Sequence, residues 1–402
     1  MSRVPQIIHT EFFAIWKLSI LSFVIAGLTG FLYRYGFLMP LPELLHLGNI
    51  RHAHSHLMFF NWITPPILIW MAAEVIRKEV NYSVRRIKQC IYTMMILGFL
   101  SWPFFLLFGY RPVSVGGANL PLAAILSGLV MITWYWFGIL YYKARQCMKS
   151  PSLSVVLFDG ALVALVVSSL GAWGVSVYQF SSLESPLISK ALTSFFLGVF
   201  TEGWVILGVL GILWSGVKRP GIINRENWLW MPVLFGSMLI FSFSLDQSIL
   251  SAPMLWSAKT GLLLIGIPLS LHLYSLWKSS FTSTGIDRVV LLLLAFKILF
   301  QAGAMLPTGI WPGEHGLRIL YLHLVLLGFA TTGLIAAFYP NGGSITKWSY
   351  IIGMAAVLTT LGMFSGYWPR ALIPQNLAFW LAGAALLPVI PVAWLLVTKN
   401  QG

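Results

Sequence analysis

The stretch that decides the fold is AHSHLMFFNWITPPILIWMAAEV, residues 53–75. A transmembrane helix needs roughly 20 predominantly apolar residues in a row, so this stretch is long enough to cross a bilayer. The whole chain has the same character, since 58% of its 402 residues are hydrophobic and only 9% are charged. These proportions exclude a soluble globular enzyme, a disordered chain and a secreted disulfide scaffold. The sequence therefore predicts a polytopic membrane protein.

Eleven further apolar stretches give about twelve predicted membrane-spanning helices in an all-α bundle. They lie near residues 11–33, 53–75, 89–110, 119–142, 156–180, 188–214, 228–250, 258–278, 286–308, 317–339, 346–367 and 376–397. The loops between them are too short for a soluble domain. We therefore expect residues 1–402 to form a single transmembrane domain.

The basic residues predict how the helices cross the membrane. With the N-terminus inside, sixteen of the 25 Lys and Arg residues fall in cytoplasmic segments and six fall in outer loops. Lys and Arg collect on the cytoplasmic side, so this bias places both termini there, in a cell (cytoplasmic or inner) membrane. The net charge of +14 then reflects loops that face anionic lipid, and no nucleic acid is expected. Cys90 and Cys147 form no CxxC or CxxCH motif, so disulfides, structural zinc and covalently attached haem are not expected.

Three histidines crowd the start of the 53–75 helix, at His52, His54 and His56. Successive residues of a helix turn by about 100°, so His52 and His56 share one face and His54 points roughly opposite. Two alternatives stay open: His54 is a lone axial ligand, or His52 and His56 form a metal pair. His315, in a predicted outer loop, could join His46 or His52 in binding copper or zinc.

A fourth histidine, His323, lies early in the 317–339 helix. That helix and the 53–75 helix both run from outside to inside, so His54 and His323 lie at similar depth, within about two turns of the outer surface. Two such histidines could hold a haem iron from its two axial sides, and Arg51 and Arg318 could pair with the haem propionates. The alternative is that both histidines only bond to backbone carbonyls near the helix ends.

These residues resemble the low-spin haem site of haem-copper oxidase subunit I, a family with twelve transmembrane helices. The family's helix 2 pattern, H-G-x-x-M-x-F-F-x-x-x-P, is matched by His54, Met58, Phe60 and Pro65, although serine replaces the glycine and asparagine the second phenylalanine. Phe59 and Phe60 would supply apolar walls for the haem. In the family's helix 10 pattern, H-x-H, His323 fits the second histidine. Tyr321 replaces the first, where it would either ligate a second haem or only pack and hydrogen-bond.

A third segment, GVFTEGW at residues 198–204, is similar to the H-x-x-x-E-G stretch of nitric oxide reductase catalytic subunits. Glu202 and Gly203 match, but Gly198 replaces the metal-binding histidine, and the histidine pair expected near helix 7 is absent as well. The resemblance thus implies one bis-histidine haem b and a lost binuclear centre, so terminal oxidase or nitric oxide reductase activity is not expected.

This resemblance implies a role in electron transfer or in the handling of nitric oxide or oxygen. The protein would act in the lipid bilayer, and a cytochrome or another respiratory subunit could be its partner. Residues 52–58 are also similar to the W-H-A-H-E-M motif of NnrS-type proteins, which contain haem and copper and are linked to nitric oxide metabolism. Copper is therefore a second, weaker expectation.

Two charged residues are predicted inside the bilayer, Glu202 near the middle of 188–214 and Lys297 near the middle of 286–308. Charges there cost free energy unless they are paired or hydrated. They form either a proton path or an ion pair that locks helices together. In the rival interpretation, a cofactor-free transporter, they line a substrate path with the helix 2 histidines, and Pro65 and Pro66 mark a broken helix. A non-catalytic assembly partner of a respiratory complex is a third possibility.

Overall fold

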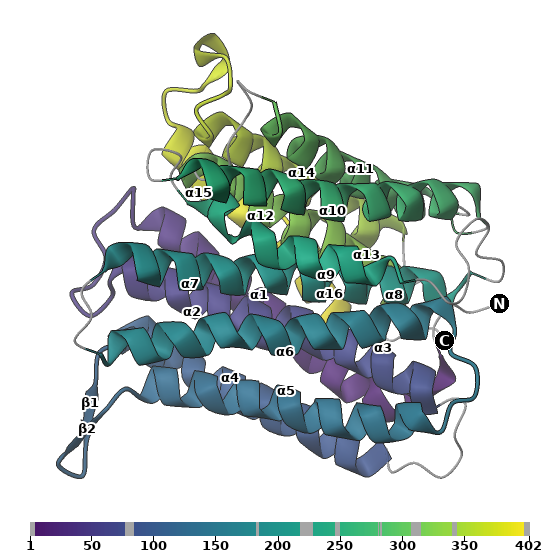
Figure 1. The fold of residues 1–402 in the computed structure, drawn as a ribbon. Helices are drawn as coiled ribbons and strands as arrows, with labels where there is room; N and C mark the ends of the chain where they lie inside the picture. Colours follow the sequence, from purple (N-terminus) through teal and green to yellow (C-terminus); the bar gives the residue numbers. More distant parts are fainter. Residues whose placement is uncertain are drawn as a thin grey trace. The chain divides into compact units, whose positions relative to one another are not determined.

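In the computed structural model the chain is built almost entirely of helices (Figure 1). The structure describes residues 5–76, 84–181, 185–217, 228–245, 250–279, 281, 284–306, 315–339 and 344–397. Within these ranges, ten helices are long and apolar enough to cross a membrane. The chain is therefore a multi-pass membrane protein of the all-α class.

Two of the twelve predicted spans differ from the other ten. The span expected at 228–250 is a shorter apolar helix, α9 (Trp230–Leu239), followed by a 3-10 turn, Ile240–Ser244. The span expected at 286–308 is α11 (Gly285–Ala304), which carries Asp287, Arg288 and Lys297. The count of twelve spans stays a prediction.

The helices group into two compact units, which we describe separately. The N-terminal unit comprises Ser2–Met148, Tyr339–Phe364 and Trp368–Gly402, and the central unit comprises Lys149–Phe338 with Ser365–Tyr367 and Met1. The N-terminal unit is therefore discontinuous in sequence, because the last helices of the chain return to the first ones.

In the part of the chain that the structure describes, the N-terminal unit contains six helical rods. Its elements are a π-helical turn at Ile8–Phe12 leading into α1 (Phe13–Tyr35); α2 (Leu47–Leu57), a π-helical segment at Met58–Ile63 and α3 (Thr64–Ile76), which form one continuous rod; α4 (Val84–Phe108); α5 (Leu122–Gln146); α14 (Ser344–Phe364); and α15 (Leu377–Leu386) with α16 (Val389–Val397), preceded by a short 3-10 turn at Arg370–Leu372. Between α4 and α5 lies a hairpin of β1 (Val113–Val115) and β2 (Ala118–Leu120). Gly116 and Gly117 form its turn with φ of 59° and 85°, which glycine adopts without steric cost.

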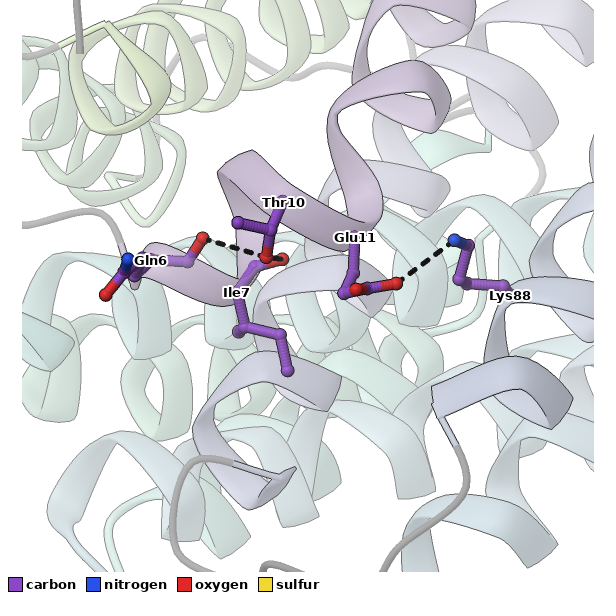
Figure 2. A network of polar contacts seen from close by, with 5 residues as sticks. All are labelled: Gln6, Ile7, Thr10, Glu11 and Lys88. Atoms are coloured by element: carbon purple, nitrogen blue, oxygen red, sulfur yellow. Dashed lines mark hydrogen bonds and ion pairs between the residues drawn. The ribbon is translucent and has the colours of Figure 1, made fainter.

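Polar contacts join the first residues of this unit to distant helices. The Glu11 carboxylate lies 3.2 Å from the Lys88 ammonium at the start of α4, while the Thr10 hydroxyl bonds to carbonyls of its own turn (Figure 2). Lys17 in α1 donates to the carbonyls of Leu395 and Leu396, at 3.0 Å in the second case. A cation at the C-terminal end of a helix is favourable, so this contact stabilises the end of α16 against α1.

The central unit contains α6 (Leu153–Gln179); α7 (Pro186–Gly198), a π-helical segment at Val199–Val205 and α8 (Ile206–Ser215), which again form one rod; α9; α10 (Ala252–Lys278); and α11. Its last rod consists of α12 (His315–His323), a π-helical segment at Leu324–Thr331 and α13 (Thr332–Phe338). Ser152 caps α6, and Thr284 and Asp287 form a reciprocal capping box at the start of α11.

Each of the three most buried rods contains a π-helical segment. These rods are Leu47–Ile76, Pro186–Ser215 and Gly316–Phe338. In two of them a threonine hydroxyl donates a hydrogen bond to the carbonyl five residues earlier. Thr64 donates to Phe59 at 2.7 Å, and Thr331 donates to Leu326 at 2.8 Å. Single π-helical turns inside α-helices occur frequently at functional sites, so these rods are where a site is best sought.

Candidate functional site

A buried polar cluster lies in the central unit. It consists of Glu202, Lys297, Gln301 and Tyr321 and is called the Glu202 cluster here. Glu202 comes from the π-helical segment between α7 and α8, Lys297 and Gln301 lie one turn apart in α11, and Tyr321 comes from α12. Glu202 and Lys297 are both fully buried, so three rods bring their polar groups together away from solvent and lipid.

The geometry of the cluster is that of an ion pair with two further hydrogen bonds. Lys297 Nζ lies 2.5 Å from Glu202 Oε2 and donates to Gln301 Oε1 at 2.9 Å. The Tyr321 hydroxyl donates to Glu202 Oε1. Of the two alternatives open from the sequence, the ion pair is therefore present, whereas the proton path stays a prediction.

The pairing explains how these charges persist in an apolar interior. An unpaired buried charge costs several kcal/mol, and attraction between partners offsets that cost only when their remaining hydrogen bonds are also made. The Tyr321 hydroxyl supplies one such bond, so hydrogen bonding, one of the roles that the sequence left open for this tyrosine, is the role observed. A carboxylate held between an ammonium and a phenol is also chemically able to take up and release a proton.

His54, in α2 of the N-terminal unit, packs against α1. Its Nδ1 lies 2.7 Å from the carbonyl oxygen of Ala26, and a side chain at Gly30 would lie within 2.9 Å of the ring. Gly30 thus allows α1 to approach the imidazole. Because a carbonyl only accepts hydrogen bonds, Nδ1 must carry the proton, and Nε2 of the neutral ring is unprotonated.

His323, the last residue of α12 in the central unit, makes an equivalent bond. Its Nδ1 lies 2.8 Å from the carbonyl oxygen of Ile319, one turn earlier, so its neutral ring also has an unprotonated Nε2. Both histidines therefore do bond to backbone carbonyls, as the simpler alternative expected. This bond does not decide against a metal, since ligating histidines usually donate their other N–H to a carbonyl or carboxylate.

The pairing of His54 with His323 around one haem stays a prediction, because the two residues belong to different units.

His52 and His56 lie on one side of α2, with ring centres 6.5 Å apart, in an aromatic cluster. The His56 ring stacks on Phe105 at 3.9 Å, and its Nε2 lies 3.3 Å from the Tyr110 hydroxyl. Burial raises the pKa of Tyr110, which follows the end of α4 at Phe108, to about 12, so its phenol keeps its proton at physiological pH. Among the residues that the structure describes, no three His, Cys, Asp or Glu side chains are grouped to hold a metal ion.

The remaining predicted site residues lie near these histidines in sequence. Arg51 is exposed in α2, and Arg318 is partly buried in α12. Met58, Phe59 and Phe60 are buried in the π-helical segment, where the Phe60 ring lies 5.1 Å from His56 and 5.8 Å from Trp134. Phe60 therefore packs on the side of α2 that carries His56. His315 begins α12, but its side chain lies outside the described residues.

Two polar residues of these clusters, Gln301 and Tyr110, were not among the predicted site residues. Gln301 follows Lys297 by four positions, and this helical spacing was a usable signal for a shared face. Tyr110 lies in a loop, and nothing in the sequence indicates that it reaches His56.

Comparison of the sequence with protein-family models and with curated proteins gives no match. The resemblance to the oxidase and reductase families therefore rests on the motif residues alone.

Proposed function

We propose that the chain is a b-type haem protein of the membrane in which His54 and His323 are the axial ligands of one haem. Its role is electron transfer, or the handling of a diatomic gas such as nitric oxide, rather than terminal reduction. The observation that carries the proposal is that the two imidazole rings have the same hydrogen bond and the same tautomer. Each directs Nδ1–H to a backbone carbonyl, and each therefore has in Nε2 the lone pair that an iron requires.

Two histidine ligands favour electron transfer over the handling of a gas. A haem with two histidine ligands supplies one-electron transfer, since a gas would have to displace one of them. Arg51 lies three residues before His54, and Arg318 lies five residues before His323. These two arginines would pair with the haem propionates. The pairing of the two histidines comes from their similar predicted depth in the sequence, and the structure supports the proposal through the surroundings of each ring.

The test is a dithionite-reduced minus oxidised visible spectrum of the detergent-purified protein. We expect a sharp low-spin b-type band in the wild type that is lost, or converted to high spin, in both His54→Ala and His323→Ala. The matched control is His9→Ala, which removes a histidine outside the proposed site and should keep the band. A colourless wild-type protein after expression with ample haem would overturn the proposal.

The second candidate is a cofactor-free transporter, and the buried Glu202–Lys297 pair favours it. Charged residues inside membrane helices commonly mark substrate or proton pathways. This candidate requires no haem, so the same spectrum separates the two: a colourless, well-folded protein would direct work to transport assays on Glu202→Gln and Lys297→Met.

A further inference from the structure

The N-terminal unit carries most of the positive charge of the chain. Its sequence contains fifteen Lys and Arg residues but only four Asp and Glu, whereas the central unit contains ten and seven. The excess of positive charges is thus eleven in the N-terminal unit and three in the central unit. Cytoplasmic loops are generally rich in basic residues, so this total alone indicates no site. The positions of the cations in the fold decide whether they form one.

Five of these cations gather where α4 begins and α5 ends, and they are called the cation cluster here. They are Arg85, Arg86, Lys88, Lys143 and Arg145. The two helices lie side by side (Figure 1), and Cys90 Sγ of α4 lies 3.4 Å from the Thr133 carbonyl oxygen of α5. Because the helices are antiparallel, Arg86 lies about 6 Å and Lys143 about 15 Å from this contact toward the same end. The cluster therefore occupies one end of the helix pair.

Three of the five cations have no partner of opposite charge in the described part of the chain. The Glu11 carboxylate pairs with Lys88 at 3.2 Å (Figure 2). Among the described residues, no carboxylate pairs with Arg85, Arg86 or Lys143, and all three residues are exposed. Like charges on one helix turn repel each other. An anion bound at this end would therefore relieve an unfavourable interaction.

An exposed apolar stripe of α5 leads up to Lys143. Its members follow one another at spacings of three or four residues, so they share one face of the helix. They are Ile125, Leu129, Ile132, Trp136 and Ile139, with Lys143 at the end. The distance from Ile125 to Lys143 is about 27 Å along the helix, close to the roughly 30 Å thickness of the hydrocarbon core. Lys143 therefore lies at the level of the lipid headgroups.

The outer face of α4 has the same order of side chains. Its exposed residues at this spacing are Arg86, Gln89, Thr93, Ile96 and Leu100. On this helix, too, a cation lies at the end and apolar side chains follow further along. A phospholipid has the matching order, with its phosphate at one end and its acyl chains at the other.

We propose that the cation cluster and these two faces bind one anionic phospholipid. Its phosphate lies at Arg86 and Lys143, and its acyl chains lie along α4 and α5. A soluble acidic partner could reach the cations but not the apolar stripe of α5, which lies at the depth of the hydrocarbon core, so the two features together favour a lipid. The site lies outside the proposed haem site and does not depend on haem binding.

The experiment measures lipid binding to the purified, delipidated full chain by native mass spectrometry. The probes are phosphatidylglycerol, phosphatidylcholine with the same acyl chains, and inorganic phosphate. We expect one phosphatidylglycerol to bind and to raise the unfolding temperature, and the other two probes to do neither. The double variant Arg86→Gln with Lys143→Gln should bind phosphatidylglycerol about 25-fold more weakly, since each Lys or Arg near an anionic lipid contributes a factor of about five.

The matched control is Arg111→Gln with Arg370→Gln, which removes the same charge from exposed positions of the N-terminal unit outside the cluster. It should bind phosphatidylglycerol as the wild type does. Equal losses in the two double variants would show only a diffuse attraction to positive charge and would overturn the proposal. Equally tight binding of phosphatidylcholine, or an equal effect of inorganic phosphate, would also overturn it. If the cluster double variant fails to fold, Lys143→Gln alone replaces it, with an expected loss of about fivefold.

Discussion

At the scale of single residues, the Glu202 carboxylate is the centre of the buried polar cluster in the central unit. One of its oxygens pairs with an ammonium and the other accepts from a phenol. Neither partner is near Glu202 in sequence, since Lys297 and Tyr321 follow it by 95 and 119 positions. The predicted depth of Glu202 and Lys297 made an ion pair one of two alternatives, but only the fold brings the atoms into contact.

Removing the phenol hydroxyl tests the bond to Glu202. Tyr321→Phe keeps the ring, whose centre lies 5.1 Å from that of Phe300, but leaves the carboxylate one donor short. We expect a loss of about 1–3 kcal/mol in the free energy of unfolding, the usual cost of an unsatisfied buried polar group. Denaturant unfolding in detergent measures it. Tyr142→Phe, at a 61% exposed position, is the control and should change little. Equal stability of the two variants would contradict the prediction.

Removing the ammonium tests the ion pair itself. Lys297→Met leaves Glu202 as an uncompensated buried charge, which costs about 3–5 kcal/mol in comparable cases. The double variant Glu202→Gln with Lys297→Met removes both charges and should be more stable than Lys297→Met alone. The free energies of unfolding of the two single variants and the double variant complete the cycle. Additive losses would show that the two residues do not interact.

At the scale of helices, close packing depends on the absence of a side chain at particular positions. In the N-terminal unit, Asn61 of the π-helical segment donates to the Met95 carbonyl of α4 at 2.8 Å. An added Cβ at Gly98, one turn further along α4, would lie 1.8 Å from Asn61 Oδ1. The polar contact between these helices therefore requires glycine at residue 98. In membranes, where lipid is as apolar as the helix faces, such close approaches are a main source of helix association.

Gly98→Ala should therefore destabilise the protein. Real Cβ atoms do not approach an oxygen so closely, so either Asn61 or α4 must shift, at a cost of about 1–3 kcal/mol typical of overpacked cores. Thermal unfolding in detergent measures the effect. Gly383→Ala in α15 is the control, because an added methyl group there meets nothing within 4 Å, and it should be neutral or slightly stabilising. A fully stable Gly98→Ala variant would contradict this packing.

Sequence patterns predict the helices better than the contacts between them. Long apolar runs locate ten of the predicted spans, because a helix is the simplest way to satisfy backbone hydrogen bonds in lipid. The π-helical segments are harder to predict, since they arise where a hydroxyl such as that of Thr64 competes for a carbonyl or where proline removes an N–H. The Tyr110–His56 contact was not predictable either, because it joins a loop to a helix 54 residues away.

At the scale of the whole molecule, the orientation predicted from the basic residues can be tested with the two native cysteines. Cys147 is exposed at the end of α5, near Lys143 and Arg145, whereas Cys90 is buried. If basic loops face the cytoplasm, Cys147 does so as well. We expect a membrane-impermeant maleimide to label Cys90→Ser protein in inverted vesicles but not in intact cells. Cys147→Ser should remain unlabelled in both, and labelling of Cys147 in intact cells would reverse the predicted topology.

The discontinuous N-terminal unit also has a consequence for how the chain is made. Translation delivers α1 well before α15 and α16, although Val389 of α16 packs within 2.4 Å of where a Cβ at Gly27 of α1 would lie. Nearly all of the central unit, from Lys149 to Phe338, emerges between them as one continuous stretch. The face of α1 that receives α16 must therefore remain in the membrane without this partner until the whole central unit and then residues 389–397 have been synthesised.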